Sequence, residues 1–257
     1  MHELRAPRTR RVRDLTIVDD DLVVATDSIG GIGPKPADTV YADAATVAHF
    51  ALRVPLLEVL CAGASPMLVI DDLCVELEPT GRQMIAEIHR LAAAAGLPPD
   101  AVTGSTEDNV ATTATGVGVT VLGRLERSAT SRPGGGQPGD VVLCAGLPIS
   151  APRDEVYIGH PDQVSVAAVV AAVASGLVHD ALPVGSKGLD WEVPQLAASA
   201  GLDFSWVQSP VARSDSGGPS SCVLFSVPQE CVEELRALME PSPVHVVARL
   251  SGGRGSL

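Results

Sequence analysis

The sequence has few aromatic and few basic residues, and both shortages argue against certain classes of function. Only 3% of the 257 residues are aromatic, and 18 Lys and Arg stand against 31 Asp and Glu, for a formal net charge of −13 at pH 7. Nucleic acids are bound through a basic surface, and exposed bases usually stack on aromatic side chains. We therefore expect no nucleic-acid partner, and we expect any anionic ligand to be held by metal ions or backbone N–H groups.

The sequence also lacks the features of membrane and secreted proteins. The longest nearly apolar stretch, 164–178, falls short of the roughly 18 to 20 residues needed to span a bilayer, and we interpret it as a buried helix. The basic segment 1–13 is not followed by the apolar region of a secretory signal. The five cysteines show no CxxC spacing. These absences predict a cytoplasmic protein with reduced cysteines and no membrane association.

A break in composition divides the chain into two halves of similar size. The segment 126–139 (ERSATSRPGGGQPG) has no apolar periodicity and is rich in Gly, Pro and Ser, which is typical of a linker or a long loop. The domains expected from it are 1–138 and 139–257.

Both halves mix strands and helices without a strict alternation, so the sequence predicts an α+β fold rather than a doubly wound parallel sheet. Strands are expected as a pair within 15–27 and at 67–77, 115–125, 141–144, 204–208, 221–227 and 244–250. Helices are expected at 44–62, with Pro55 starting a second segment, and at 78–96, 162–175, 189–200 and 228–239.

Segment 27–40 (DSIGGIGPKPADTV) follows a predicted strand and holds Gly30, Gly31 and Gly33 just before Lys35. It fits neither GxxxxGK[ST] nor GxGxxG, and no serine of the chain stands in a GxSxG motif. Glycines allow close backbone approach, and the exposed N–H groups can cradle phosphate oxygens. The segment is therefore either an ordinary glycine-rich turn or a phosphate site.

Several acids stand at the ends of apolar elements: Asp14, Asp27, Glu58, Asp71, Asp72, Glu107 and Asp108. Glu58 lies inside the apolar stretch 54–64, where a carboxylate is costly unless it is paired or bound to a metal. Carboxylate oxygens of this kind suit Mg²⁺, although a solvent-facing Glu on a helix would give the same pattern. The turn 103–109 (TGSTEDN) also carries acids, but most such turns are solvated loops, and the isolated histidines receive no role.

Taken in order, several segments resemble the aminoimidazole ribonucleotide synthetase superfamily, which includes thiamine-monophosphate kinase, selenophosphate synthetase and the hydrogenase-maturation dehydratase. The segments that carry the resemblance are 22–35 (LVVATDSIGGIGPK), 54–70 (VPLLEVLCAGASPMLVI), 103–109, 115–125 (TGVGVTVLGRL), 139–148 (GDVVLCAGLP), 177–202 and 221–238. Within this superfamily, DSxGGIGxK, the EVLCAGA-type turn, EPTG at 78–81 and GSTE are most similar to the α-ribazole kinase branch.

The resemblance implies two α+β domains, with the first pairing with its copy in a homodimer around a barrel, and ATP bound with Mg²⁺ by acidic residues. Position by position, it implies metal ligands at Asp14, Asp27, Glu58 and Asp108. It implies nucleotide-binding residues at Gly30, Gly31, Gly33, Lys35, Gly104, Ser105 and Thr106, and catalytic residues at Lys35 and Asp180.

Two of the superfamily's motifs are altered in this chain. The GG[DE]T turn is Thr103–Thr106, with Ser105 in place of the acid, so that Glu107 or Asp108 would have to replace it. The HDxSDGG motif is reduced to HDALP, so that its second aspartate is missing. The resemblance implies a kinase of a small nucleoside-like metabolite, with α-ribazole as the first acceptor to test. The alternatives are another ATP-dependent synthetase or kinase, similar to thiamine-monophosphate kinase, and a nucleotide-binding dimer without catalysis.

Overall fold

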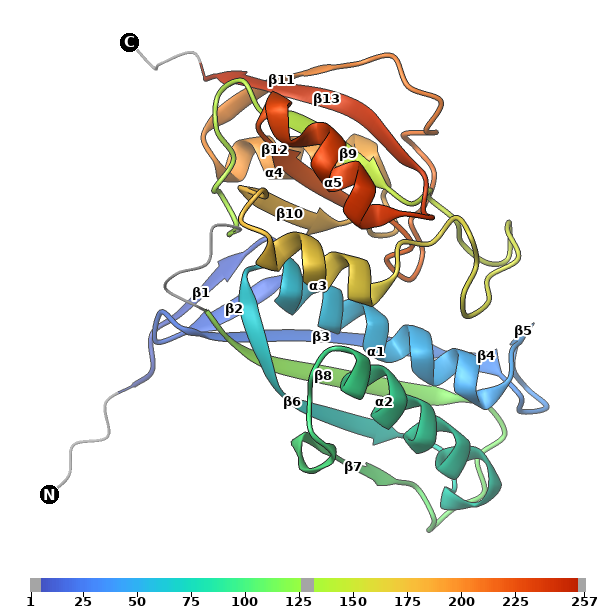
Figure 1. Cartoon of the computed structure of the whole chain (residues 1–257). Helices are drawn as coiled ribbons and strands as arrows, with labels where there is room; N and C mark the ends of the chain where they lie inside the picture. Colours follow the sequence, from blue (N-terminus) through green and yellow to red (C-terminus); the bar gives the residue numbers. More distant parts are fainter. Residues whose placement is uncertain (1–5, 126–131, 254–257) are drawn as a thin grey trace, which may run out of the picture.

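The computed structural model describes residues 6–125 and 132–253, which form two β-sheets joined by a shared core (Figure 1). The first sheet has the strand order β1-β2-β3-β8-β6-β7, with β1 Thr9–Val12, β2 Leu15–Val18, β3 Leu22–Gly30, β6 Ala64–Leu73, β7 Val102–Thr106 and β8 Gly116–Leu125. The second has the order β10-β12-β9-β13-β11, with β9 Val141–Ala145, β10 Asp180–Pro183, β11 Leu202–Trp206, β12 Val223–Val227 and β13 Val244–Gly252. A short parallel pair, β4 Ile32–Gly33 and β5 Val40–Tyr41, stands at the end of β3.

Two helices cover one face of the first sheet: α1 Ala44–Cys61 and α2 Arg82–Ala94 (Figure 1). Helix α1 begins at Asp43, whose Oδ1 accepts a hydrogen bond from the Thr46 N–H at 2.8 Å. The sequence predicted a break at Pro55, but the structure has one continuous helix. The packing of the buried leucines around Pro55 outweighs the single backbone hydrogen bond that proline removes.

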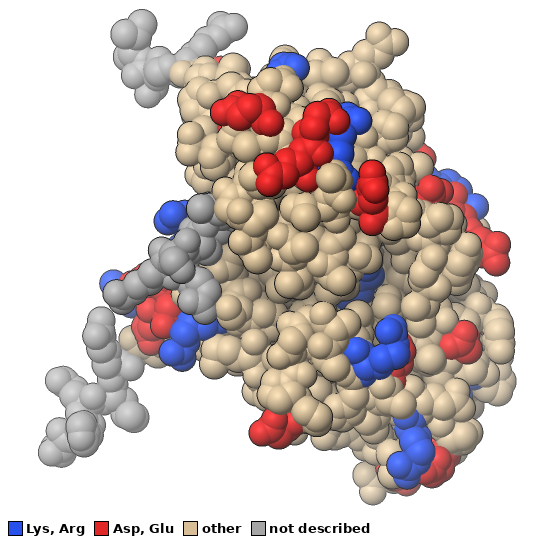
Figure 2. Space-filling model, viewed as in Figure 1, with Lys and Arg blue, Asp and Glu red and all other residues tan. Residues whose placement is uncertain are grey.

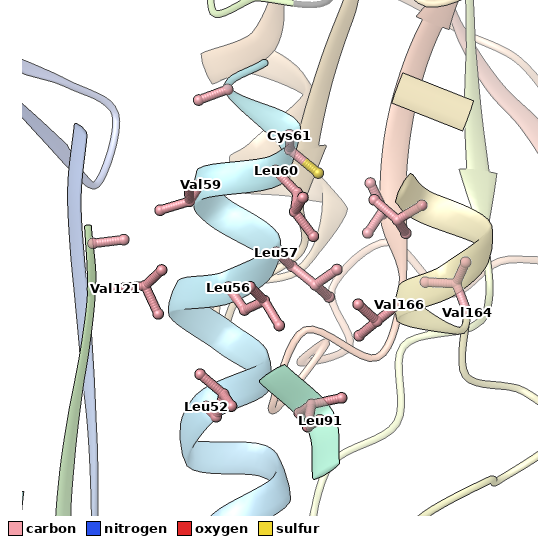
Figure 3. Close-up of a cluster of buried hydrophobic side chains, with 14 of the residues drawn as sticks. Leu52, Leu56, Leu57, Val59, Leu60, Cys61, Leu91, Val121, Val164 and Val166 are labelled. Atoms are coloured by element: carbon pink, nitrogen blue, oxygen red, sulfur yellow. The ribbon is translucent and has the colours of Figure 1, made fainter. Parts of the chain in front are cut away.

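Helix α1 is the central element of the core that both halves share. By length and composition it could cross a membrane, but 78% of its apolar window is buried inside the protein, as in the core helix of a soluble protein. Figure 3 shows Val59 pointing toward Val121 of the first sheet, whereas Leu57 points toward Val166 of the second half. Because α1 is buried on several sides, its sequence is apolar all round.

The second sheet is covered on both faces. Helices α3 Val166–Ala174 and α5 Val232–Met239 pack on the side that faces α1, and α4 Leu189–Ser199 packs on the other. Every residue of β9 and β12 is therefore buried, and apart from Ser226 both strands are apolar without alternation.

The outer face of the first sheet differs, because no described helix packs on it (Figure 1). Strands β3 and β8 alternate between buried residues toward the helices and partly exposed residues on this outer face. Val24, Leu122 and Leu68 lie side by side there, in the register of neighbouring strands, and all three are half-buried. This row of the face is thus apolar and only partly covered.

Most of the predicted strands and helices are present, but five strands were not predicted. Strand β1 lies within the basic N-terminal segment, the pair β4–β5 lies in and just after the glycine-rich segment 27–40, β7 lies in the predicted turn 103–109, and β10 lies in the altered HDALP motif. Strands β7 and β10 are held by pairing with distant strands: β7 runs parallel to β6 with Thr103 opposite Ile70, and β10 pairs with β12. Strand β1 instead forms a hairpin with β2, with Val12 opposite Leu15. Sequence periodicity does not show these strands, because they are short and β1 and β7 are exposed edges.

The described loops and cysteines bear on two further predictions. Part of the predicted linker, 126–131, lies outside the described residues, as do residues 1–5 of the basic segment. The first sheet uses only residues before 126 and the second only residues after 140, yet one hydrophobic cluster runs through both. The boundary at 138/139 therefore stays a prediction. Cys74, Cys144, Cys222 and Cys231 form no disulfide bond.

Candidate functional site

A cavity of about 220 Å³ lies between the two halves, and four carboxylates line it. Asp14 comes from the β1–β2 turn, Asp27 from β3, Glu58 from α1, and Glu192 from α4 of the second half. The first three are predicted metal ligands that are far apart in the sequence, and the fold brings them to one cavity. Glu192 was not predicted, because an acid in the first turn of a helix is ordinary and nothing local marks it as buried.

Burial and neighbouring negative charges raise the pKa values of Glu58 and Glu192 in this cavity. Burial, followed by the charges of Asp14, Asp27 and Glu192, raises the pKa of Glu58 to about 8. Burial and the charge of Asp14 raise the pKa of Glu192 to about 7. Burial also raises the pKa of Asp27, against a hydrogen bond from the Ser28 backbone. The cavity thus concentrates negative charge that a cation would offset.

The donor set fits Mg²⁺ in its chemistry. Within residues 6–125 and 132–253, no three His, Cys, Asp or Glu side chains converge closely enough to hold an ion by themselves. Mg²⁺, however, is usually held by one or two carboxylates, with water and substrate phosphates as its other ligands. Asp14, Asp27, Glu58 and Glu192 supply hard oxygen ligands for such a partly open site.

Arg13 is the single basic side chain among the described residues that line this cavity. Its Nη1 donates to Asp180 Oδ1 at 3.0 Å and its Nη2 to Asp180 Oδ2 at 2.5 Å, and Asp180 Oδ2 also accepts the Gly134 N–H at 3.0 Å. Burial raises the pKa of Asp180, and the nearby Arg13 guanidinium opposes the rise. Asp180, predicted as catalytic, is fully buried behind the cavity wall, where it holds Arg13 and the loop before β9 in place.

The structure places the glycine-rich segment outside this cavity. A Cβ on Gly33 would lie 2.2 Å from Thr115 Oγ1 and 2.8 Å from Asp38 Oδ2, so glycine is needed there for packing. The Lys35 Nζ forms an ion pair with Glu76 Oε2, and this contact is the main reason that the pKa of Glu76 falls to about 2. In the single chain, Gly30, Gly31, Gly33 and Lys35 are therefore not brought to the carboxylates.

The predicted nucleotide turn is also remote from the carboxylates. Gly104, Ser105 and Thr106 lie on β7 and line a separate cavity of about 200 Å³. Asp108 Oδ1 accepts the Leu77 N–H at 3.0 Å, and its Oδ2 accepts the Thr106 hydroxyl at 2.8 Å. The predicted metal ligand Asp108 thus serves as a cap for the chain around Leu77.

Arg53 links α1 to the second half and was not identified from the sequence. Its side chain is 2% exposed and donates to the Ser220 carbonyl at 3.0 and 3.1 Å and to the Val164 carbonyl at 2.5 Å. Burial without a carboxylate partner among these bonds lowers the pKa of Arg53 to about 10. Because Ser220 lines the carboxylate cavity, Arg53 fixes one of its walls.

No protein-family model and no curated protein matches the chain, but solved structures do. The HypE–HypF complex matches with a TM-score of 0.66 at 13% identity, covering 93% of this chain and 87% of that one. Thiamine monophosphate kinase from Aquifex aeolicus matches with a TM-score of 0.63 at 15% identity, covering 90% and 86%. T. maritima PurL complexed with ATP matches with a TM-score of 0.62 at 19% identity, covering 93% of this chain and 42% of PurL.

The likeness to these structures extends along nearly the whole chain. The chain therefore shares their mixed α+β fold.

Proposed function

We propose that the protein is an ATP- and Mg²⁺-dependent kinase of a small nucleoside-like metabolite. The observation that carries the proposal is the cavity between the halves, where Asp14, Asp27, Glu58 and Glu192 face one another with Arg13 as the one described cation in the lining. Among the structures with this fold, HypE and PurL were solved with ATP, and thiamine monophosphate kinase is a kinase by name.

The proposed reaction moves one phosphoryl group. The oxygen of the acceptor hydroxyl forms a bond to the γ-phosphorus of ATP, and the bond from that phosphorus to the β–γ bridging oxygen breaks, so that ADP leaves. The hydroxyl proton passes to a carboxylate at the cavity edge, for which Asp27 is the candidate. When bound, Mg²⁺ would offset the negative charge of the phosphates. One or two of Asp14, Glu58 and Glu192 would hold it, with water and phosphate oxygens as its other ligands, and Arg13 would attract the phosphate groups.

The first acceptor to test is α-ribazole, whose 5′-hydroxyl would be phosphorylated in the salvage of the cobalamin lower ligand. Its support is the sequence resemblance in segments 27–35 and 78–81. The alternatives are a reaction similar to that of thiamine-monophosphate kinase and a nucleotide-binding protein without catalysis. Ser105 and Pro183, which stand where related motifs carry acids, are the residues that support the last alternative.

We also infer a homodimer that pairs the outer faces of two first sheets. The support is the row of half-buried Val24, Leu122 and Leu68 on a face that no described helix covers. Pairing two such faces would bury apolar surface. Sedimentation equilibrium tests this directly: a monomer at every concentration would contradict it, and Leu122→Glu should convert a dimer to a monomer.

The experiment for the kinase is a phosphotransfer assay with ATP, Mg²⁺ and α-ribazole, with ADP and the acceptor product measured by mass spectrometry. A product heavier by one phosphoryl group supports both the reaction and the acceptor. If calorimetry shows ATP binding but no product forms, the proposed nucleotide site is supported and α-ribazole is contradicted as the acceptor. If ATP does not bind at all, the proposal is wrong.

A further inference from the structure

A second and larger cavity, of about 610 Å³, adjoins the carboxylate cavity. Its walls are the end of β3, the β4–β5 pair and the start of α1 on one side, and residues 150–157 of the second half on the other. Asp27 and Gly218 line both cavities, so the two are contiguous at these residues. Its volume is in the range of pockets that enclose a whole small molecule.

The walls of this second cavity are apolar and aromatic. The chain has only three Phe, two Tyr and two Trp, yet Phe50 and both tyrosines, Tyr41 and Tyr157, line this one space. Ile32, Val40 and Val47 extend the apolar surface. Tyr41 is 81% exposed, so its ring stands at the cavity edge with its face open to a partner. Aromatic side chains at a cavity in a chain with few of them favour a flat ring as ligand.

The charge of the second cavity is acidic. Its described lining contains Asp27, Asp43, Asp154 and Glu155, and it contains no Lys, Arg or His. Arg153 pairs with Asp154 at 2.6 Å and with Asp215 at 2.9 Å, so its guanidinium is engaged by two acids. Nothing in this lining would offset the charge of a phosphate.

The start of α1 does not supply an anion site in this cavity either. A free helix N-terminus attracts phosphate through its exposed N–H groups. Here the Asp43 carboxylate already occupies that position, because its Oδ1 accepts the Thr46 N–H and its Oδ2 accepts the Thr46 hydroxyl at 2.9 Å. A phosphate at this end of the helix would have to approach Asp43.

We propose that the second cavity binds the phosphoryl acceptor, and that this acceptor is a flat aromatic compound, neutral or cationic, that carries no phosphate before the reaction. The inference rests on the proposed kinase function and names its substrate class. Since the cavities meet at Asp27, the ring of the acceptor would lie among the aromatic side chains, with its hydroxyl directed toward the nucleotide phosphates. The reaction that supplies this substrate must therefore release or leave a free hydroxyl.

The test is calorimetric binding of two matched probes, benzimidazole riboside and its 5′-phosphate, to the full chain without ATP. We expect the riboside to bind at least about tenfold more tightly than its phosphate, because only the phosphate meets the acidic lining. Equal or tighter binding of the phosphate would overturn the proposal. Titration of ATP with Mg²⁺ into the same protein reports the kinase function separately. ATP binding without discrimination between the probes contradicts only the acceptor class, whereas discrimination without ATP binding contradicts only the kinase.

Two exposed positions make the test specific to the second cavity. Tyr41→Ala should weaken riboside binding about fivefold and leave the affinity for ATP with Mg²⁺ unchanged, because the removed ring stacks on the acceptor. Weakened ATP binding with unchanged riboside binding would show that adenine occupies the cavity and would overturn the proposal. Glu155→Lys should reduce the preference for the riboside, whereas Asp100→Lys, an exposed acid outside both cavities, should not change it.

Discussion

The carboxylate cavity and the surroundings of Lys35 in the glycine-rich segment 27–40 both contain buried or partly buried acids, but the acids have opposite kinds of charged neighbours. In the cavity, Glu58 and Glu192 repel their neighbours, and their pKa values rise to about 8 and about 7. In the glycine-rich segment, Lys35 pairs with Glu76, and the pKa of Glu76 falls to about 2. An acid that is paired with a cation, as Glu76 is with Lys35, stabilises the fold, whereas acids that lack such a partner create a site for a cation.

The largest effect should come from Asp27, which stands where the two cavities meet. Asp27→Asn should lower kcat by about a thousandfold, or about 4 kcal/mol in the activation free energy, because the change removes charge at the transferring group. Thermal unfolding should be unchanged or shifted upward, since the pKa of Asp27 is raised by burial. Coupled measurement of ADP release gives kcat, and Asp100→Asn is the matched exposed control. Unchanged turnover in Asp27→Asn would contradict the assignment of the carboxylate cavity as the catalytic site.

The next effect concerns the one buried ion pair at the cavity. Asp180→Asn should lower the free energy of unfolding by about 3 kcal/mol, because it leaves the Arg13 guanidinium without a counter-charge in a buried position. The matched control is Asp215→Asn at the exposed pair with Arg153, for which we expect less than about 1 kcal/mol. Urea unfolding of both variants measures the difference. Equal losses would mean that the Arg13–Asp180 pair is no stronger than a surface pair.

A smaller effect should appear as a pH dependence of stability. The folded-state pKa of Glu58, about 8, lies above its ordinary value of 4.5, so its contribution to stability is complete below pH 4.5 and is lost as the pH rises toward 8. Glu58→Gln should therefore raise the free energy of unfolding by about 2 kcal/mol at pH 8 and by much less at pH 5. Urea unfolding in the presence of a chelator measures this. The same gain at both pH values would contradict the raised pKa.

The smallest effect should come from Lys35 in the glycine-rich segment. Lys35→Met should lower the free energy of unfolding by about 1 kcal/mol, because it removes one ion pair near the surface, and kcat should stay within about threefold of the parent. The double variant Lys35→Met/Glu76→Gln should recover part of the lost stability. A large fall in kcat with unchanged unfolding would instead show that Lys35 reaches the phosphates, and would erase the contrast between the two regions.

The local signals in the sequence predicted much of the fold. The strand predicted at 115–125 matches β8, and the helix predicted at 189–200 matches α4. Strands β7 and β10 were missed because their stability comes from β6 and β12, which are distant in the chain. The homodimer and the boundary near residue 138 stay predictions. Figure 2 shows acids grouped over α5 and separate basic side chains on that face. The lack of a nucleic-acid partner stays a prediction.

The sequence by itself predicted that any anionic ligand would be met through metal ions or backbone N–H groups rather than through a basic surface. It also singled out Asp14, Asp27 and Glu58, because a charge amid apolar residues is visible locally. Only the tertiary structure decided that Glu192 joins them and that Lys35 and Asp108 do not. Whether a charged group is neutralised depends on neighbours that lie tens of residues away in the chain, and those neighbours are set by packing of the two halves around α1.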